Sequence, residues 1–260
     1  MLYREVQPRP ELATFVECLW TLEDDGALEP GRPEPILPDG CSELILNFGA
    51  RFNEQLEDGR REAQPLHFLV GQMTRPILIA PTGRVRLVGI RFQPGGAFPF
   101  FRLPMNELAD TIVELSAVDA TLERELIAVA ADKPLLQHKL LAIEDFLARR
   151  TRHFRNESWL PRLAAAVIRT GGRQSVDELA TAVGVTGRQL QRRFLREVGI
   201  GPKLLCRILR FQQVFRAIEL NQDGWAPIAA DCGYYDQAHL IRDFQQFARQ
   251  TPAVLLAHTT

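Results

Sequence analysis

The sequence lacks the features of a membrane or secreted protein. In 260 residues, no apolar run approaches the roughly 20 residues that a membrane-spanning helix needs. The first residues, MLYREVQPRPEL, do not show the basic-then-apolar pattern of a secretory signal. The four cysteines, none in a Cys-x-x-Cys pair, are Cys18, Cys41, Cys206 and Cys232. We therefore expect a cytoplasmic protein without a membrane partner, whose cysteines are reduced and packed as small apolar residues.

Residue patterns of common catalytic and cofactor sites are also missing. No Gly-rich phosphate loop, Gly-x-Ser-x-Gly turn or His-Glu-x-x-His sequence occurs. A barrel oxygenase needs two histidines and a carboxylate that converge on a metal, but His67 and His138 are far apart in the chain. We therefore expect no enzyme, no catalytic residue, no metal site and no cofactor.

The composition is that of an ordinary globular protein, with an uneven distribution of charge. Charged residues make up 24% of the chain and hydrophobic residues 46%. The net charge is −1, whereas residues 171–260 carry 11 basic and 8 acidic residues, a net +3. Nearly all basic residues are arginine, which suits contacts with phosphates and guanine, although genome composition is the simpler explanation of that bias.

Short apolar runs broken by Pro and Gly fill residues 1 to about 110 and predict an antiparallel sheet or barrel. The runs of strand length are Ser42–Phe48, Leu66–Gly71, Pro76–Ala80 and Arg84–Phe92. Turns are expected at Pro38-Asp39-Gly40, Asp58-Gly59 and Pro94-Gly95-Gly96.

The pattern becomes helical from about Met105. Apolar residues recur at spacings of three and four at Leu122, Leu126 and Val129, and again at Leu136, Leu140, Ile143 and Leu147. The charged stretch 149–157 marks a boundary. We predict an α+β protein with a β-rich, barrel-like domain at 1–115, a helical linker at 116–155 that could also dimerise, and an all-α domain at 156–260.

An internal near-repeat dominates the last third of the chain. Leu179-Ala180-x-x-Val183-Gly184-Val185 matches Ile228-Ala229-x-x-Cys232-Gly233-Tyr234 at an offset of 49 residues. Leu190 and Phe194 match Leu240 and Phe244 at an offset of 50, and Gly201-Pro202 matches Thr251-Pro252. A single copy of this pattern is often just two packed helices. Two copies predict two helix-turn-helix units, at about 175–198 and 227–248.

Each unit has the signals of two short helices joined by a turn. In the first, Ser175 and Glu178 have the spacing of a capping box. Gly184 suits the left-handed residue after a helix, and Thr186 can cap the next helix. The inner face of that second helix is Leu190, Phe194 and Val198. The second unit repeats the scheme with Pro227, Ile228, Ala229, Gly233, Asp236, Leu240 and Phe244.

The outer faces of the second helices carry residue types that read base edges, since Arg pairs with guanine and Gln with adenine. The first outer face holds Arg188, Gln189, Gln191, Arg192, Arg193 and Arg196, and the second holds Gln237, His239 and Arg242. Arg193 and Arg196 suit phosphate contacts or solvation better than base reading. A helix from Lys203 to about Leu220 would set the distance between the units, so that both could use one face of a duplex.

These motifs resemble the DNA-binding domain of AraC/XylS transcription regulators. The resemblance covers roughly Leu160–Leu256 and rests on Gln-Leu-Gln-Arg-Arg-Phe at 189–194, Gly-Ile-Gly-Pro at 199–202, and Ile-Ala-x-x-Cys-Gly-Tyr-Tyr-Asp-Gln-Ala-His-Leu-x-Arg-x-Phe at 228–244. It implies that the base-reading helices begin near Thr186 and Asp236. It also implies that Arg188, Gln191 and Arg192 face bases in one, and Gln237, His239 and Arg242 in the other. One departure is Arg249, where the family often has a glycine.

The N-terminal part is similar to a β-rich sensor domain of some AraC-type regulators, through Pro-Asp-Gly-Cys-Ser-Glu-Leu-Ile at 38–45 and Gly-Ile-Arg-Phe-Gln-Pro-Gly-Gly at 89–96. A ligand cavity would need apolar walls and a few polar groups. The candidate effector-binding residues are Trp20, Glu43, Phe48, Phe68, Arg91 and Phe92, with Phe98, Phe100 and Phe101 as further aromatics. The alternative is that these aromatic residues are ordinary core.

Together these features predict a sequence-specific transcription regulator gated by a small molecule. Its expected partners are double-stranded DNA, a small-molecule effector, a second copy of the chain, and RNA polymerase in the case of an activator. The alternative is a regulator or architectural DNA-binding protein whose N-terminal domain only dimerises or docks a protein partner.

We predict that Arg192→Ala and Arg242→Ala each weaken binding to the specific operator by about 1–3 kcal/mol, because each removes an arginine expected to read a base. Titration of the operator duplex with each variant measures the loss. Unchanged affinity in both variants would contradict the placement of the two helices on DNA.

Overall fold

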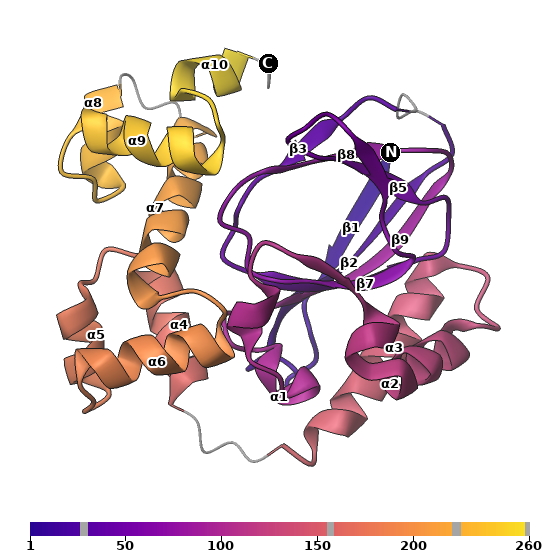
Figure 1. Ribbon diagram of the computed structural model, residues 1–260. Helices are drawn as coiled ribbons and strands as arrows, with labels where there is room; N and C mark the ends of the chain where they lie inside the picture. Colours follow the sequence, from indigo (N-terminus) through magenta and orange to yellow (C-terminus); the bar gives the residue numbers. More distant parts are fainter. Residues whose placement is uncertain (27–30, 155–158, 220–224, 258–260) are drawn as a thin grey trace.

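The computed structural model describes residues 1–26, 31–154, 159–219 and 225–257, and it confirms the predicted α+β class. Two sheets face each other in the N-terminal part, two helices lie below the larger sheet, and the C-terminal part is entirely helical (Figure 1). The charged stretch 149–157 begins in the last turn of helix α3 (Leu136–Thr151), and part of it lies outside the described residues.

The larger sheet has the strand order β1-β2-β9-β4-β7-β10, and every neighbouring pair is antiparallel. Its strands are β1 (Leu2–Val6), β2 (Val16–Asp24), β4 (Ser42–Asn47), β7 (His67–Val70), β9 (Val85–Phe92) and β10 (Ile112–Glu114). The smaller sheet has the order β3-β8-β5-β6. Its strands are β3 (Glu34–Ile36), β5 (Phe52–Gln55), β6 (Arg61–Ala63) and β8 (Ile77–Pro81).

All four predicted strand runs are confirmed, as β4, β7, β8 and β9. Glycine has a positive φ in each of the three predicted turns, at Gly40, Gly59 and Gly95. Both faces of the larger sheet are buried, which explains why β9 alternates only partly. Its even-numbered residues from Val88 to Phe92 pack against the helices, while Val85 and Leu87 face the smaller sheet.

The helical pattern expected from Met105 onward is interrupted by a strand. Residues Met105–Leu108 form a 3-10 turn (η1), and β10 then pairs with β7, Ile112 lying opposite Val70. The reason is local: β-branched Ile112 and Val113 extend the open edge of the larger sheet before helix formation begins at Leu115. The short helix α1 (Phe98–Phe101) precedes η1.

The covering helices α2 (Leu115–Ala130) and α3 (Leu136–Thr151) confirm the predicted spacing of three and four. Their apolar stripes are used against the larger sheet, where Leu122, Leu126 and Ile143 are completely buried. Only isolated apolar residues are left outside, with Leu135 57% and Leu141 42% exposed. The predicted helical linker therefore packs mainly on the β-rich part, and its role in dimerisation stays a prediction.

The C-terminal part contains both predicted helix-turn-helix units. Its helices are α4 (Leu160–Arg169), α5 (Val176–Ala182), α6 (Gly187–Glu197), α7 (Pro202–Glu219), α8 (Trp225–Asp231), α9 (Gln237–Phe247) and α10 (Pro252–Ala257). The inner faces of α6 and α9 join one core with α7, and Leu190, Phe194, Leu240 and Phe244 have no exposed surface. In Figure 1, α6 and α9 lie near opposite ends of α7 and both run across it.

The turn before α10 keeps a glycine-like backbone without a glycine. Arg249 has a φ of 57°, in the left-handed region. An L-residue there costs roughly 1–2 kcal/mol. The departure from the family pattern at this position therefore changes the residue and leaves the turn in place.

The β-rich part contacts the helical part at several points, among them an ion pair between Glu57 and Arg249 at 3.5 Å and two closely packed contacts. The 37–41 loop, which leads into β4, packs on α7: the amide of Gln212 donates to the carbonyl oxygen of Pro38 at 2.6 Å. A Cβ built on Gly40 would lie 3.0 Å from the Leu205 side chain. At the other contact, η1 lies against the end of α6, where Gly199 approaches the carbonyl of Met105.

We predict that Gly184→Ala lowers the free energy of unfolding by about 1 kcal/mol, because Gly184 has a φ of +66° that an L-residue rarely adopts. Gly187→Ala is the matched control. A Cβ meets no atom within 4 Å at either position, but Gly187 is not in the left-handed region. Urea unfolding of both variants measures the difference, and equal destabilisation would contradict the backbone argument.

Candidate nucleic-acid interface and the Arg91 network

Capping residues fix where the two predicted base-reading helices begin. Thr186 accepts from the backbone N–H of Gln189, whose side-chain oxygen accepts in return from the N–H of Thr186 at 2.9 Å. Asp236 accepts from the backbone N–H of His239 at 2.7 Å. Both helices therefore start where the sequence indicates. Thr186, Gln189 and Asp236, three of the predicted DNA-binding residues, use side-chain oxygens for these caps.

The outer face of α6 divides into two groups. Arg188, Gln191 and Arg192 are exposed, and no ion pair of the two arginines occurs within the described residues. Arg193 instead pairs with Glu197 at 2.8 Å and lies over the Trp159 ring. The guanidinium of Arg196 lies 5.5 Å from the ring centre of Phe98 in α1, so it contacts the β-rich part. Arg193 and Arg196 thus have partners within the protein.

The outer face of α9 follows the same scheme with fewer charges. Gln237 and Arg242 are exposed. His239 is half-buried and packs edge-on against the Tyr234 ring, with 5.2 Å between ring centres. The two side chains most accessible on this face are therefore Gln237 and Arg242.

A buried ion pair that the sequence analysis did not identify ties α9 to α7. Arg207 donates to Asp243 at 2.6 Å, and the Asp243 side chain is only 1% exposed. Arg207 also lies over the Phe247 ring. The sequence indicates that Asp243 needs a partner, because it lies next to Phe244 on the inward side of α9, where a buried carboxylate requires a positive charge nearby.

The predicted effector residues separate onto the two faces of the larger sheet. Trp20 and Phe68 point toward the smaller sheet. Phe92 belongs to the core on the other face and packs against Phe100 and Phe101, and Phe48 lies there as well. The six candidate effector residues therefore do not share one face of the sheet, because neighbouring residues of a strand point to opposite faces.

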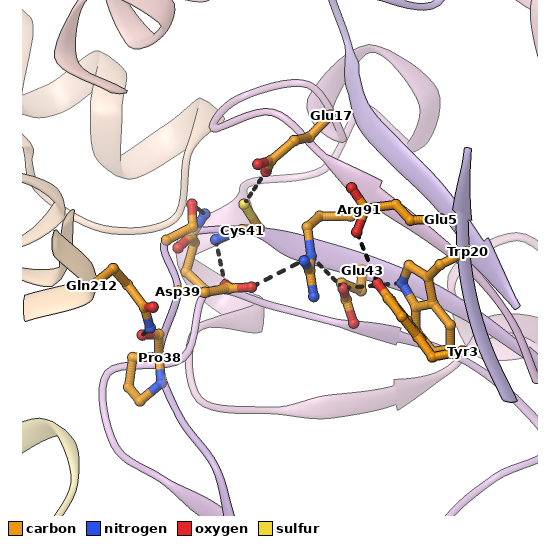
Figure 2. A network of polar contacts seen from close by, with 12 residues as sticks. Tyr3, Glu5, Glu17, Trp20, Pro38, Asp39, Cys41, Glu43, Arg91 and Gln212 are labelled. Atoms are coloured by element: carbon orange, nitrogen blue, oxygen red, sulfur yellow. Dashed lines mark hydrogen bonds and ion pairs between the residues drawn. The ribbon is translucent and has the colours of Figure 1, made fainter. Parts of the chain in front are cut away.

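Arg91 and Glu43 form the centre of a polar network that reaches the domain contact (Figure 2). Arg91 donates to Glu43 at 2.7 Å and lies 3.4 Å from Asp39. The indole N–H of Trp20 donates to the same Glu43 oxygen at 3.3 Å. Trp20 lies against Gly89, where no room remains for a Cβ. The network therefore connects the inward sheet face to the loop that packs on α7.

The 37–41 loop concentrates negative charge around one arginine. Asp39 accepts from the backbone N–H of Cys41 at 2.9 Å, and the Cys41 thiol donates to Glu17 at 3.0 Å. Burial and the carboxylate of Glu43 raise the pKa of Asp39 to about 7, against the opposing effect of Arg91. Burial and nearby carboxylates hold the pKa of the Cys41 thiol well above its usual range. Cys41 is therefore a protonated structural thiol.

A cavity of about 140 Å³ lies beside this loop, between the β-rich part and α7. Its walls include Asp39, Cys41 and Arg91 on one side and Gln212 and Arg216 on the other. The cavity therefore lies at the contact between the β-rich part and the helical part.

All four cysteines are free and buried, as the sequence predicts. Across the described ranges there is no group of three or more His, Cys, Asp or Glu side chains able to hold a metal ion. Within the same ranges, no helix combines the length and the apolar character needed to cross a membrane.

Two family models match separate parts of the chain. The one described as a helix-turn-helix domain matches residues 179–258, and the one described as a domain of unknown function matches residues 4–114. No curated protein sequence matches the chain. The helix-turn-helix match includes α6, α7 and α9, and thus the first predicted unit from Leu179 onward and the whole of the second.

Several solved structures are similar over most of their length. ToxT from Vibrio cholerae has 8% identity and a TM-score of 0.49, with 92% of this chain and 98% of that chain covered. Unsaturated fatty acid-bound wild-type ToxT from Vibrio cholerae strain SCE256 has 10% identity and a TM-score of 0.48, with 91% and 94% covered. The AraC-like transcriptional activator CuxR has 10% identity and a TM-score of 0.32, with 83% and 86% covered.

The network around Asp39 predicts a pH effect on stability. Because its pKa is raised from 3.8 to about 7 in the folded protein, the folded state holds this proton more tightly. The contribution of Asp39 is therefore fully present below about pH 4 and is lost as the pH rises toward 7. Asp39→Asn should make the thermal midpoint less dependent on pH in this window.

The exposed Asp132 provides the control, since Asp132→Asn should leave the pH profile of the parent protein unchanged. The Asp39 side chain retains 35% exposure, so solvent screening limits the size of the effect. Parallel profiles for the parent and Asp39→Asn between pH 4 and 7 would contradict the assignment.

Proposed function

We propose that this protein is a sequence-specific transcription regulator gated by a small molecule, starting from the premise that residues 179–258 match a helix-turn-helix domain. The observation that carries the proposal is the pair of exposed polar faces on α6 and α9, held by one apolar core at the two ends of α7. A polar helix face anchored from behind is the geometry that enters a major groove.

The base-reading residues of this proposal are those whose side chains make no hydrogen bond or ion pair with other described residues. Arg188, Gln191 and Arg192 on α6, with Gln237 and Arg242 on α9, are exposed and available to base edges. Thr186 and Asp236 would cap the two helices and so fix their N-termini. Arg193 would be held by Glu197 and Arg196 by Phe98, so these two arginines would contact DNA phosphates rather than bases. His239 would help to hold the outer face of α9 in place by packing against the Tyr234 ring.

The effector would act through the network between the sheet and α7. Trp20, Glu43 and Arg91 are joined by hydrogen bonds, and Arg91 continues to Asp39 in the loop that contacts Gln212. The neighbouring cavity of about 140 Å³ is smaller than the ~300–1,000 Å³ of typical ligand pockets. A ligand that competes for Arg91 would therefore have to shift the 37–41 loop, and with it the support of α7.

The domain organisation proposed with this mechanism is unchanged from the sequence: a sensor at 1–115, helices at 116–155 and a DNA-binding domain at 156–260. Contacts with a second copy of the chain and with RNA polymerase remain predictions. A cytoplasmic location follows from the proposed role on DNA and is also a prediction.

Mapping of the sites that the full chain occupies across its genome tests the proposal and supplies an operator. We expect one recurrent sequence, bound at least about 1,000-fold more tightly than unrelated DNA. Absence of any sequence preference would favour the architectural alternative.

A metabolite screen by thermal shift on the full chain should then give a compound that changes operator affinity. A screen in which no compound shifts the melting temperature, together with a stable dimer, would favour the partner-docking alternative.

Gln212→Ala offers a test of the coupling between the 37–41 loop and α7, in combination with the compound found by the screen. Loss of the hydrogen bond to Pro38 should loosen the loop from α7 and shift operator affinity in the same direction as the compound found by the screen. Gln137→Ala, on exposed α3 surface far from this contact, is the control. A compound that changes operator affinity equally in the parent and in Gln212→Ala would contradict the proposed route.

A further inference from the structure

A second, larger hollow lies within the helical part. It has a volume of about 600 Å³ and is formed by the end of α4, the turn that leads into α5, and the second half of α7. Ile168, Gln213 and Arg216 line both this hollow and the cavity at the 37–41 loop, so the two are neighbours along α7. Neither the base-reading faces nor the Arg91 network accounts for this hollow.

The walls of the hollow carry an excess of positive charge. Arg169, Arg173 and Arg216 line it, with Glu178 as the one carboxylate among the residues that form its walls. Glu178 is already used, since one of its oxygens accepts from the backbone N–H and the hydroxyl of Ser175 at 2.7 and 2.8 Å. In the described part of the chain no carboxylate forms an ion pair with any of the three arginines.

The segment that carries Arg173 is held in place by other residues. Gly171 and Gly172 both have a positive φ, and Arg210 donates to the carbonyl oxygen of Gly172 at 3.2 Å. Arg173 also donates through one nitrogen to the carbonyl oxygen of Asp231 at the end of α8. The remaining donors of Arg173 are therefore presented from a fixed backbone, with less ordering left to occur on binding.

We propose that this hollow is a phosphate-binding site. Guanidinium groups bind phosphate oxygens through paired charge-assisted hydrogen bonds, and three arginines around one hollow complement at least two negative charges. The phosphate has two sources: a phosphorylated small molecule, for which the volume is sufficient, or the backbone of a DNA duplex bound by α6 and α9. The second source rests on the proposed function, and the first does not.

Titration calorimetry of the full chain with inorganic pyrophosphate tests the first source. We expect saturable binding that weakens at least about tenfold in Arg169→Ala and in Arg216→Ala. These two variants are preferred because, unlike Arg173, neither side chain makes a hydrogen bond or ion pair within the described residues. Arg162→Ala, an exposed arginine of α4 outside the hollow, is the matched control and should bind like the parent.

The salt dependence of affinity for the mapped operator tests the second source. A lost phosphate contact should reduce the slope of log affinity against log salt by about one and weaken all sequences equally. Arg192→Ala should instead relax sequence preference, so failure of the proposed function is distinguishable from failure of the hollow. The proposal is overturned if pyrophosphate does not bind and the slopes of Arg169→Ala and Arg216→Ala equal that of Arg162→Ala.

Discussion

The DNA-binding part depends on how its two outer helices are anchored from behind. Leu190 and Phe194 of α6, and Leu240 and Phe244 of α9, are completely buried. The Phe244 ring meets Phe211 of α7 with 4.8 Å between centres, so the core of the second unit includes the connecting helix. Because apolar residues at four-residue spacing occupy one side of a helix, the polar residues can only occupy the other. The chemistry offered to a nucleic acid is thus set by the packing.

Elements specified by local signals could be predicted from the sequence. The capping box at Ser175, the cap at Thr186 and the left-handed Gly184 act within a few residues, and all are found where the spacing places them. The apolar stripes of α2 and α3 are equally local. For the same reason β4, β7, β8 and β9, which are dominated by buried apolar residues, were recognisable as strands.

Elements specified by their neighbours could not be predicted in this way. Strand β2 mixes Glu and Asp with apolar residues and has a bulge between Val16 and Cys18, which breaks its alternation. Strand β1 is an exposed edge, and β10 has three residues whose extended form depends on pairing with β7. Their secondary structure comes from the sheet they join.

The candidate sites show the same division. Helix positions identified the exposed Arg192 and Arg242, but not that Arg196 would lie on Phe98, nearly a hundred residues earlier. Composition identified Glu43 and Arg91 as polar groups among aromatics, but strand register was needed to separate Trp20 from Phe92. The raised pKa values of the loop residues Asp39 and Cys41 come first from burial and then from the surrounding carboxylates, which the sequence alone does not bring together.

The β-rich part supports α7 mainly at the end next to α6, through η1 and the 37–41 loop, while one exposed ion pair, between Glu57 and Arg249, reaches the segment after α9. With 18 residues at about 1.5 Å each, α7 is about 27 Å long. A rotation of about 10° at the supported end would carry α9 through roughly 5 Å, more than the 3.4 Å rise of one base pair. The same rotation would displace Gln212, about 15 Å along the helix, by roughly 2.6 Å, so α9 cannot move in this way without disturbing the contact between Gln212 and the 37–41 loop.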